Sequence, residues 1–169
     1  ICRESNANIR NCLFKGNNII LSDGCRFCSF LLITGDAIFV ENSEAIVDNC
    51  TFTDNSFSNP TIGSAIYGWM ESRIVITNSI LSEQYALVPF VNYLLDPVTP
   101  EVTYSMVNKG FPGAGNIDAD PLFRNPENGD FRLKLNTPCI DTGTATDLST
   151  DFEGNPRPVD LRGRGFEGL

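Results

Sequence analysis

A short motif recurs four times along the chain and limits the folds open to it. Its clearest copy is Val47-Asp48-Asn49-Cys50-Thr51-Phe52, and Ile9-Arg10-Asn11-Cys12-Leu13-Phe14 matches it position for position. A third copy is Ile76-Thr77-Asn78-Ser79-Ile80-Leu81, and Thr103-Tyr104-Ser105-Met106-Val107 is a more divergent fourth. The small residues of the four copies lie 38, 29 and 26 residues apart. Repeats with periods of about 20 to 50 residues are typical of solenoids.

The residue types of the motif predict a corner between two short strands. Each copy has an apolar β-branched residue, a polar residue that is usually asparagine, a small residue, and an apolar residue two places on. Asparagine tolerates the left-handed backbone region, so it can turn a sharp corner. Residues two apart on a strand share a face, which predicts that Cys50 and Phe52 both point inward. We expect Asn11, Asn49 and Asn78 to form a corner ladder, each side chain bonded to the next coil.

A second pattern repeats at nearly the same period and suggests that whole coils recur. Gly35-Asp36-Ala37-Ile38-Phe39-Val40 is echoed by Gly63-Ser64-Ala65-Ile66-Tyr67-Gly68. We therefore predict an all-β fold, a right-handed parallel β-helix that forms a single-stranded solenoid of about four to five coils. Residues 1–110 would form the coils, and residues 111–169 a loop-rich C-terminal cap packed on the same solenoid, the whole being one domain.

Composition removes several classes of function. The net charge of −9 argues against binding to nucleic acid, whose phosphates would be repelled. The chain has no histidine, which removes imidazole catalysis and the commonest metal ligand. No apolar run is long enough to span a membrane. The start at Ile1 has no signal-peptide pattern, and we expect it to lie inside a longer gene product.

The six cysteines do not follow a zinc-site spacing. Only Cys25-Arg26-Phe27-Cys28 has a C-x-x-C spacing, and there is no second pair to complete four ligands. In an extracellular chain we expect a local Cys25–Cys28 disulfide in an insertion loop. Cys12 and Cys50 should stack in adjacent coils as free thiols, because buried cysteine behaves as a small apolar residue.

The C-terminal third resembles a known family. The resemblance lies in four ordered motifs within residues 102–160, which are Asn116-Ile117-Asp118-Ala119-Asp120-Pro121-Leu122-Phe123, Gly129-Asp130-Phe131-Arg132-Leu133, Thr137-Pro138-Cys139-Ile140-Asp141-Thr142-Gly143 and Asp151-Phe152-Glu153-Gly154-Asn155-Pro156-Arg157-Pro158. They are similar to the C-terminal end of bacterial secreted parallel β-helix repeat proteins, in particular the choice-of-anchor Q module. The coils at residues 9–81 more loosely resemble the pectate-lyase-like superfamily. The resemblance implies a secreted or surface-anchored protein.

Carboxylates gather near the end of the chain, and their role has three readings. We expect Asp141 and Asp151 to form a buried ion pair with Arg157 that fastens the tail. Alternatively, Asp141, Asp151 and Glu153 would hold Ca²⁺, since carboxylate oxygens suit that ion. Catalytic carboxylates are the third reading, as in glycoside hydrolases. Asp48 and Thr77 occupy the same repeat position, so no acidic column runs along the coils, which argues against a lyase groove.

Two functions from different classes remain open. The first is a non-enzymatic extracellular structural or adhesive module that needs no cofactor, with Ca²⁺ as the one candidate ion. Its partners would be another copy of itself through the coil edges, an upstream domain, or extracellular glycans. The second is the C-terminal part of a polysaccharide lyase or glycoside hydrolase, which rests on the superfamily resemblance alone. No catalytic residue is assigned.

Overall fold

A computed structural model describes residues 1–19, 35–57, 64–82 and 98–157, which fold into short strands and a single 3₁₀ turn. Most of the strands fall into four consecutive groups, here called rows. Row 1 contains β1 (Cys2–Arg3), β2 (Ala7–Arg10), β3 (Leu13–Lys15) and β4 (Asn18–Ile19). Row 2 contains β5 (Gly35–Glu41), β6 (Glu44–Asp48), β7 (Thr51–Thr53) and β8 (Ser56–Phe57). Row 3 contains β9 (Ser64–Trp69), β10 (Arg73–Thr77) and β11 (Ile80–Leu81), and row 4 contains β12 (Glu101–Thr103) and β13 (Met106–Val107).

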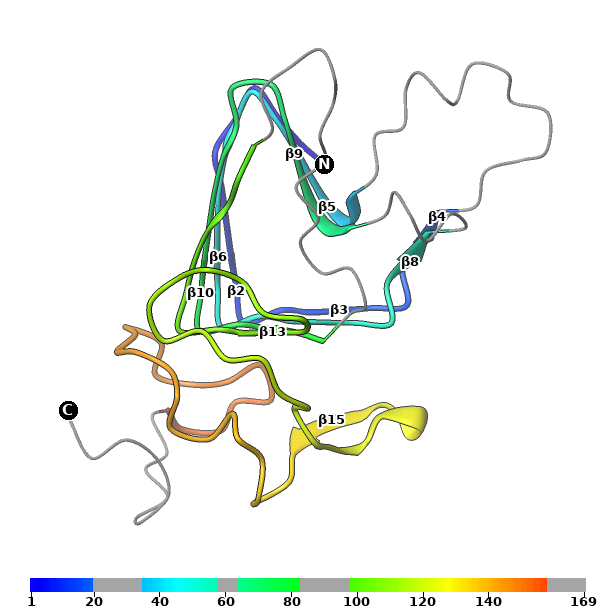
Figure 1. The fold of residues 1–169 in the computed structure, drawn as a ribbon, viewed down its shortest axis with the longest axis vertical. Helices are drawn as coiled ribbons and strands as arrows, with labels where there is room; N and C mark the ends of the chain where they lie inside the picture. The colour runs from blue at the N-terminus through cyan, green and yellow to red at the C-terminus, as the bar shows by residue number, and fades with distance from the viewer. Residues whose placement is uncertain (20–34, 58–63, 83–97, 158–169) are drawn as a thin grey trace.

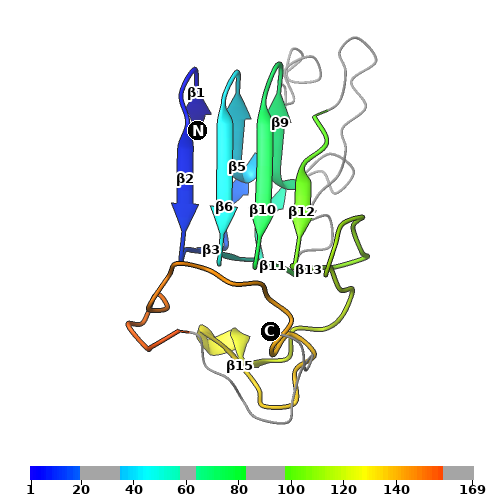
Figure 2. The same ribbon diagram turned by 90° about the vertical axis from the view of Figure 1, so that its left-hand side faces the viewer.

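Successive rows stack on one another through parallel strand pairs (Figures 1 and 2). The stacking builds sheets in the orders β1-β5-β9, β2-β6-β10-β12, β3-β7-β11-β13 and β4-β8. Ala7 lies beside Ala45, Ala45 beside Ile74, and Ile76 beside Val102. These pairs have the 38-, 29- and 26-residue offsets of the sequence motif. The motif alignment therefore predicted the register of the sheets.

The prediction of a right-handed parallel β-helix is wrong. In the described part of the chain no closed solenoid is found, and the strands instead form four small parallel sheets and one antiparallel pair. The repeated residues lie in the strands and at the corners between them. The segments that join the rows differ in length, residues 20–34 after row 1 and 58–63 after row 2, and carry no repeat. A repeat of strands and corners specifies which strands lie side by side, but it does not specify that each row closes into a coil.

The corners between strands depend on left-handed backbone conformations. Asn11, Asn49, Asn78 and Tyr104 occupy equivalent corners in rows 1 to 4, with φ of 53°, 55°, 52° and 49°. The preceding corner has the same conformation at Glu4, Asn42 and Met70. Asparagine is the residue with a Cβ that best accepts this region. Its recurrence in the motif thus has a direct conformational cause.

The core lies between the sheets and is built from the inward residues of each row. Val40, Val47, Phe52, Ile76 and Leu81 are all completely buried. Equivalent residues of neighbouring rows pack on one another, and the rings of Phe14 and Phe52 stack with their centroids 4.8 Å apart. As expected, Cys50 and Phe52 both face this core.

The C-terminal part of the described chain packs outside the rows (Figure 1). It contains an antiparallel hairpin of β14 (Phe123–Asn125) and β15 (Asp130–Leu133), joined by the 3₁₀ turn Pro126–Asn128. Phe123 is buried and packs edge-to-face on Phe131. No helix among the described residues is both long and apolar enough to cross a bilayer.

Candidate functional site at the asparagine corner

A hydrogen-bond ladder along the corner is formed by two serines, Ser79 after Asn78 in row 3 and Ser105 after Tyr104 in row 4. Ser79 Oγ accepts the backbone N–H of Cys50 at 3.2 Å and donates to the Thr77 carbonyl at 2.8 Å. Ser105 repeats both contacts one row later, with the Ser79 N–H at 3.1 Å and the Thr103 carbonyl at 2.8 Å. Each hydroxyl therefore joins two rows at a buried position.

The asparagine side chains instead bind a segment from the C-terminal part, residues 143–150, which we call the strap. Asn78 Oδ1 accepts the Thr144 N–H at 2.7 Å, Asn49 Nδ2 donates to Thr146 Oγ1 at 3.4 Å, and Asn11 Nδ2 donates to the Thr150 carbonyl at 2.8 Å. The strap thus crosses rows 3, 2 and 1 in turn, as the orange segment of Figure 2 shows. Of the expected bonds between coils, the described structure has one, from Asn78 Nδ2 to Asp48 Oδ1 at 3.2 Å.

A true asparagine ladder occurs at a different corner. Asn17 Nδ2 and the Asn17 N–H both donate to Asn55 Oδ1, at 2.7 and 3.1 Å. Asn55 Nδ2 in turn donates to the Phe14 carbonyl at 3.0 Å. Asn17 and Asn55 lie three residues beyond the motif copies in rows 1 and 2, and sequence analysis did not select them, because spacing alone does not say which side chains point between rows.

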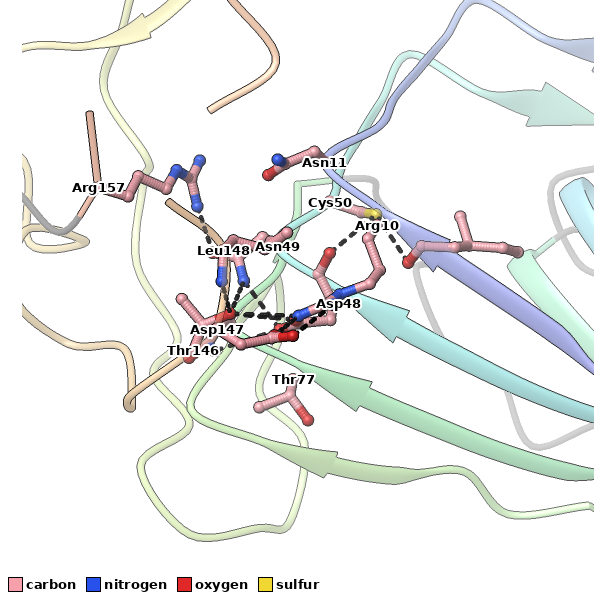
Figure 3. Close-up of polar contacts among 12 residues, drawn as sticks. Arg10, Asn11, Asp48, Asn49, Cys50, Thr77, Thr146, Asp147, Leu148 and Arg157 are labelled. Atoms are coloured by element: carbon pink, nitrogen blue, oxygen red, sulfur yellow. Dashed lines mark hydrogen bonds and ion pairs between the residues drawn. The ribbon is translucent and has the colours of Figure 1, made fainter. Parts of the chain in front are cut away.

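Where the strap meets rows 1 and 2, six polar residues converge (Figure 3). We call this set the corner cluster, and it consists of Arg10, Asp48, Asn49, Thr146, Asp147 and Arg157. Arg10 lies at its centre, with Nη2 3.0 Å from Asp48 Oδ2 and with a second ion pair to Asp147. Thr146 Oγ1 donates to Asp48 Oδ2 at 3.3 Å, and Arg157 donates to Asn49 Oδ1.

The electrostatics of the corner cluster stabilise its charged forms. Hydrogen bonds from Arg10 hold the pKa of the Asp147 carboxyl below its usual value. The same pairs, with Asp147 first and Asp48 second, raise the pKa of the Arg10 guanidinium. A general acid of the glycosidase type needs a carboxyl with a raised pKa, and an arginine that acts as a general base must first lose its proton. The pKa of Asp147 is lowered and that of Arg10 is raised, so both groups stay charged, as in an ion pair.

The predicted ion pair of Asp141 and Asp151 with Arg157 is wrong. Among the described residues, Arg157 bonds to Asn49 and forms no ion pair with either aspartate. Asp151 organises its own loop, accepting the Glu153 and Asn155 N–H groups at 2.9 and 2.8 Å. A further bond from the Asn155 side chain is the main cause of the lowered pKa of Asp151. The ion pair that joins the strap to the rows is Arg10–Asp147, and sequence analysis did not select Arg10.

The three candidate metal ligands belong to two different turns of the C-terminal part. Asp151 and Glu153 share the loop around Asn155, while Asp141 occupies a left-handed turn with φ of 57°. Within residues 1–19, 35–57, 64–82 and 98–157, no group of three or more His, Cys, Asp or Glu residues is placed to hold a metal ion. Ca²⁺ binding by Asp141, Asp151 and Glu153 stays a prediction. The predicted Cys25–Cys28 disulfide lies outside the described residues.

The cysteines of the corner are free thiols in the core. Cys50 lies beside Cys12 of row 1, and its Sγ donates to the Asp48 carbonyl at 3.4 Å. Burial raises the pKa of the Cys50 thiol to about 12. A thiol with so high a pKa is a poor nucleophile near neutral pH, so Cys50 belongs to the core.

Comparison with known proteins adds no relative. A scan against protein-family models finds no match, and searches of curated proteins and of solved structures find none either. The family resemblance of residues 102–160 therefore stays a prediction from their motifs.

Proposed function

We propose that this chain is a non-enzymatic structural or adhesive module of an extracellular protein. The observation that carries the proposal is the use of its charged side chains to join one row to the next. Arg3 pairs with Glu41 and Arg10 with Asp48 between rows 1 and 2. Arg73 then bridges row 3 to Glu44 of row 2 and to Glu101 of row 4. These charged side chains are paired with one another between rows, which is the arrangement expected of a scaffold.

The extracellular setting is part of the proposal. It is supported by the motifs of residues 102–160, which resemble those of secreted repeat proteins. Extracellular glycans and an upstream domain are the partners proposed for such a module. The acidic surface, with a net charge of −9, supports the exclusion of nucleic acid.

The alternative is a polysaccharide lyase or glycoside hydrolase, and the corner cluster is the observation that favours it. Two carboxylates and a guanidinium converge there on the outside of the rows. Along the row register, however, Asp48 is followed by Thr77 and then Thr103, so no line of acidic residues extends across the sheet. The lowered pKa of Asp147 also opposes a proton-donating role.

A turnover assay separates the two functions. The intact protein is incubated with uronate polymers and with neutral plant polysaccharides, with and without Ca²⁺, and the reducing ends and unsaturated products are measured. The proposal predicts no products above those of a heat-denatured control. Product formation that is lost in the Asp147→Asn variant would overturn the proposal and place catalysis in the corner cluster.

A further inference from the structure

The two ends of the stack differ in whether another segment of the described chain covers them. At row 4, residues 113–117 cover the last strands: the Ser105 N–H donates to Asn116 Oδ1 at 3.1 Å, and the Val107 N–H donates to the Ile117 carbonyl at 3.0 Å. Val102, Met106 and Val107 are accordingly at most 3% exposed. Row 4 is therefore a closed end.

Row 1 is an open end within the described part of the chain. In row 2 the inward residues Ala45, Val47, Cys50 and Phe52 are no more than 1% exposed. Their partners in row 1 occupy the same register but are only half-buried, namely Ala7, Ile9, Cys12 and Phe14. The strands β2 and β3 are each the last in their sheets, so one edge of each has no strand partner among the described residues. The core thus ends on a partly exposed apolar face bordered by strand edges.

Row 1 also repeats the residues with which row 2 binds it. Ser43 Oγ accepts the Ser5 N–H at 3.0 Å, and Asn55 Oδ1 accepts the Asn17 N–H at 3.1 Å. Ser5 and Asn17 are the row 1 equivalents of Ser43 and Asn55, 38 residues earlier. A further row stacked on row 1 would therefore meet a serine hydroxyl and an asparagine side-chain oxygen, the two acceptors that row 2 presents to row 1.

The charges of row 1 indicate the character of that further row. Row 1 carries three cations against a single acid, Glu4, on a chain whose net charge is −9. Arg10 already pairs with Asp48 and Asp147, and Lys15 lies over the Phe131 ring, so Arg3 is the cation that faces the edge. In the interior of the stack, Arg73 has a glutamate on both sides, from rows 2 and 4. Arg3 is the corresponding case at the edge: it has Glu41 of row 2, and its side chain is 59% exposed. An acid opposite Arg3 would complete the same arrangement.

We propose that row 1 is a docking edge for an extended, acidic polypeptide segment that pairs with β2 and β3 in parallel and in register. Strand addition of this kind supplies main-chain hydrogen bonds, and the side chains of alternate residues supply specificity. Here the added segment would also cover Ile9, Cys12 and Phe14. The inference builds on the proposed structural role, but the turnover assay tests that role by itself.

A second copy of this chain fits the edge less well. Two copies joined through row 1 would bring the exposed Arg3 of one copy to an edge that carries the same cation in the other, and like charges oppose association. Docking of row 1 onto row 4 of another copy is opposed by residues 113–117, which already cover that end. An acidic segment meets neither obstacle.

The probe is a synthetic peptide with the sequence of residues 41–57, which forms part of row 2. In the intact protein these residues pair in register with the opposite edge of row 1, and a further row would repeat that register. It carries acids at the registers of Arg3 and Arg10, namely Glu41 and Asp48, and Phe52 to stack on Phe14. Cys50 of the peptide is replaced by serine, the residue at this position in rows 3 and 4. The control peptide has lysine in place of Glu41 and Asp48.

The blocking variant of the intact protein is Asn8→Pro. The Asn11 N–H bonds to Asp48 of row 2, and alternate N–H groups of a parallel strand point to the same side, so the Asn8 N–H points away from row 2. Proline at such an edge position removes an outward donor and spares the existing ladder. Asn8→Ala is the matched control, because it removes the same side chain and keeps the N–H. Circular dichroism and a thermal melt verify that both variants fold.

Binding is measured by fluorescence anisotropy of the labelled peptide. We expect saturable binding to the wild type and to Asn8→Ala, with dissociation constants within about twofold, and a loss of more than about tenfold in Asn8→Pro. The lysine peptide should bind at least about tenfold more weakly. Absence of saturable binding to the wild type, or equal binding to Asn8→Pro, would overturn the proposal. Self-association of the wild type in sedimentation velocity that Asn8→Pro abolishes would assign the edge to a second copy and also overturn it.

Discussion

At the scale of single residues, each corner asparagine combines a backbone role with a side-chain role. Asn78 has a φ of 52°, and its Oδ1 also accepts the Thr144 N–H of the strap. Glycine adopts this backbone conformation readily, whereas it costs a residue with a Cβ roughly 1–2 kcal/mol. The two roles can therefore be separated by choosing between glycine and alanine.

We predict that Asn78→Ala is less stable than Asn78→Gly by about 1 kcal/mol in urea unfolding, because both variants lose the strap contact but only alanine strains the backbone. Asn8 is the control position, since it lies within β2 and has no positive φ. There glycine should be the less stable replacement. Equal stability of the two Asn78 variants would contradict the conformational role of the corner.

The small residue after the asparagine gives a second prediction. Ser79 is 1% exposed, and its hydroxyl is the acceptor for the Cys50 N–H. Ser79→Ala leaves that buried N–H without a partner and should cost about 1–3 kcal/mol of unfolding free energy. Ser79→Cys should cost less, because cysteine fills this position in rows 1 and 2. Ser149→Ala, in the exposed part of the strap, is the control and should be close to neutral. A neutral Ser79→Ala would contradict the ladder.

At the scale of elements, the strap is the feature with the least signal in the sequence. It is bound to the rows by side-chain contacts such as the Arg10–Asp147 pair, whose members are 137 residues apart. The corner asparagines could be predicted, since a repeated motif marks positions with a shared conformation. The side chains that meet the strap could not, because residues 143–150 contain no repeat. For the same reason the sequence favoured Asp141 and Asp151 as partners of Arg157, where the structure has Asn49.

The strap should loosen in acid. Arg10 lowers the pKa of Asp147, so this carboxylate stabilises the bound strap fully above the ordinary aspartate pKa of about 3.9. That stabilisation is lost as the pH falls through the lower pKa that Asp147 has in the folded state. We expect the amide resonances of Thr144, Thr146 and Thr150 to shift in NMR spectra over this range, while those of Ile74 and Ile76, buried in β10, stay in place.

Two variants make the acid experiment specific. Asp147→Asn should produce the loosened strap at neutral pH and remove its response to acid. Asp130→Asn is the control: the pKa of Asp130 is lowered to about 2 by Arg132, and the two residues bond to each other within β15. A strap that responds to acid equally in Asp147→Asn and in the wild type would rule out the Arg10–Asp147 pair as its fastening.

At the scale of the whole molecule, the sequence predicted how the rows stack but not how each row is completed. The offsets of 38, 29 and 26 residues between the motif copies are the register of the parallel sheets. Closure of a coil depends on the segments between rows, such as residues 20–34 and 58–63, whose lengths and residues do not repeat. Local repetition therefore fixes neighbouring strands and leaves the path between them undetermined.

The central claim is that the stack formed by the described residues is closed at row 4 and open at row 1. Hydrogen–deuterium exchange of the intact protein, resolved by mass spectrometry, tests it most directly, because an uncovered edge opens locally more often than a covered one. The account predicts that peptides containing β2 and β3 exchange much faster than peptides containing β6, β10 or β13. Slow exchange in β2 and β3, equal to that of β6 and β7, would show that row 1 is covered and would contradict the open end.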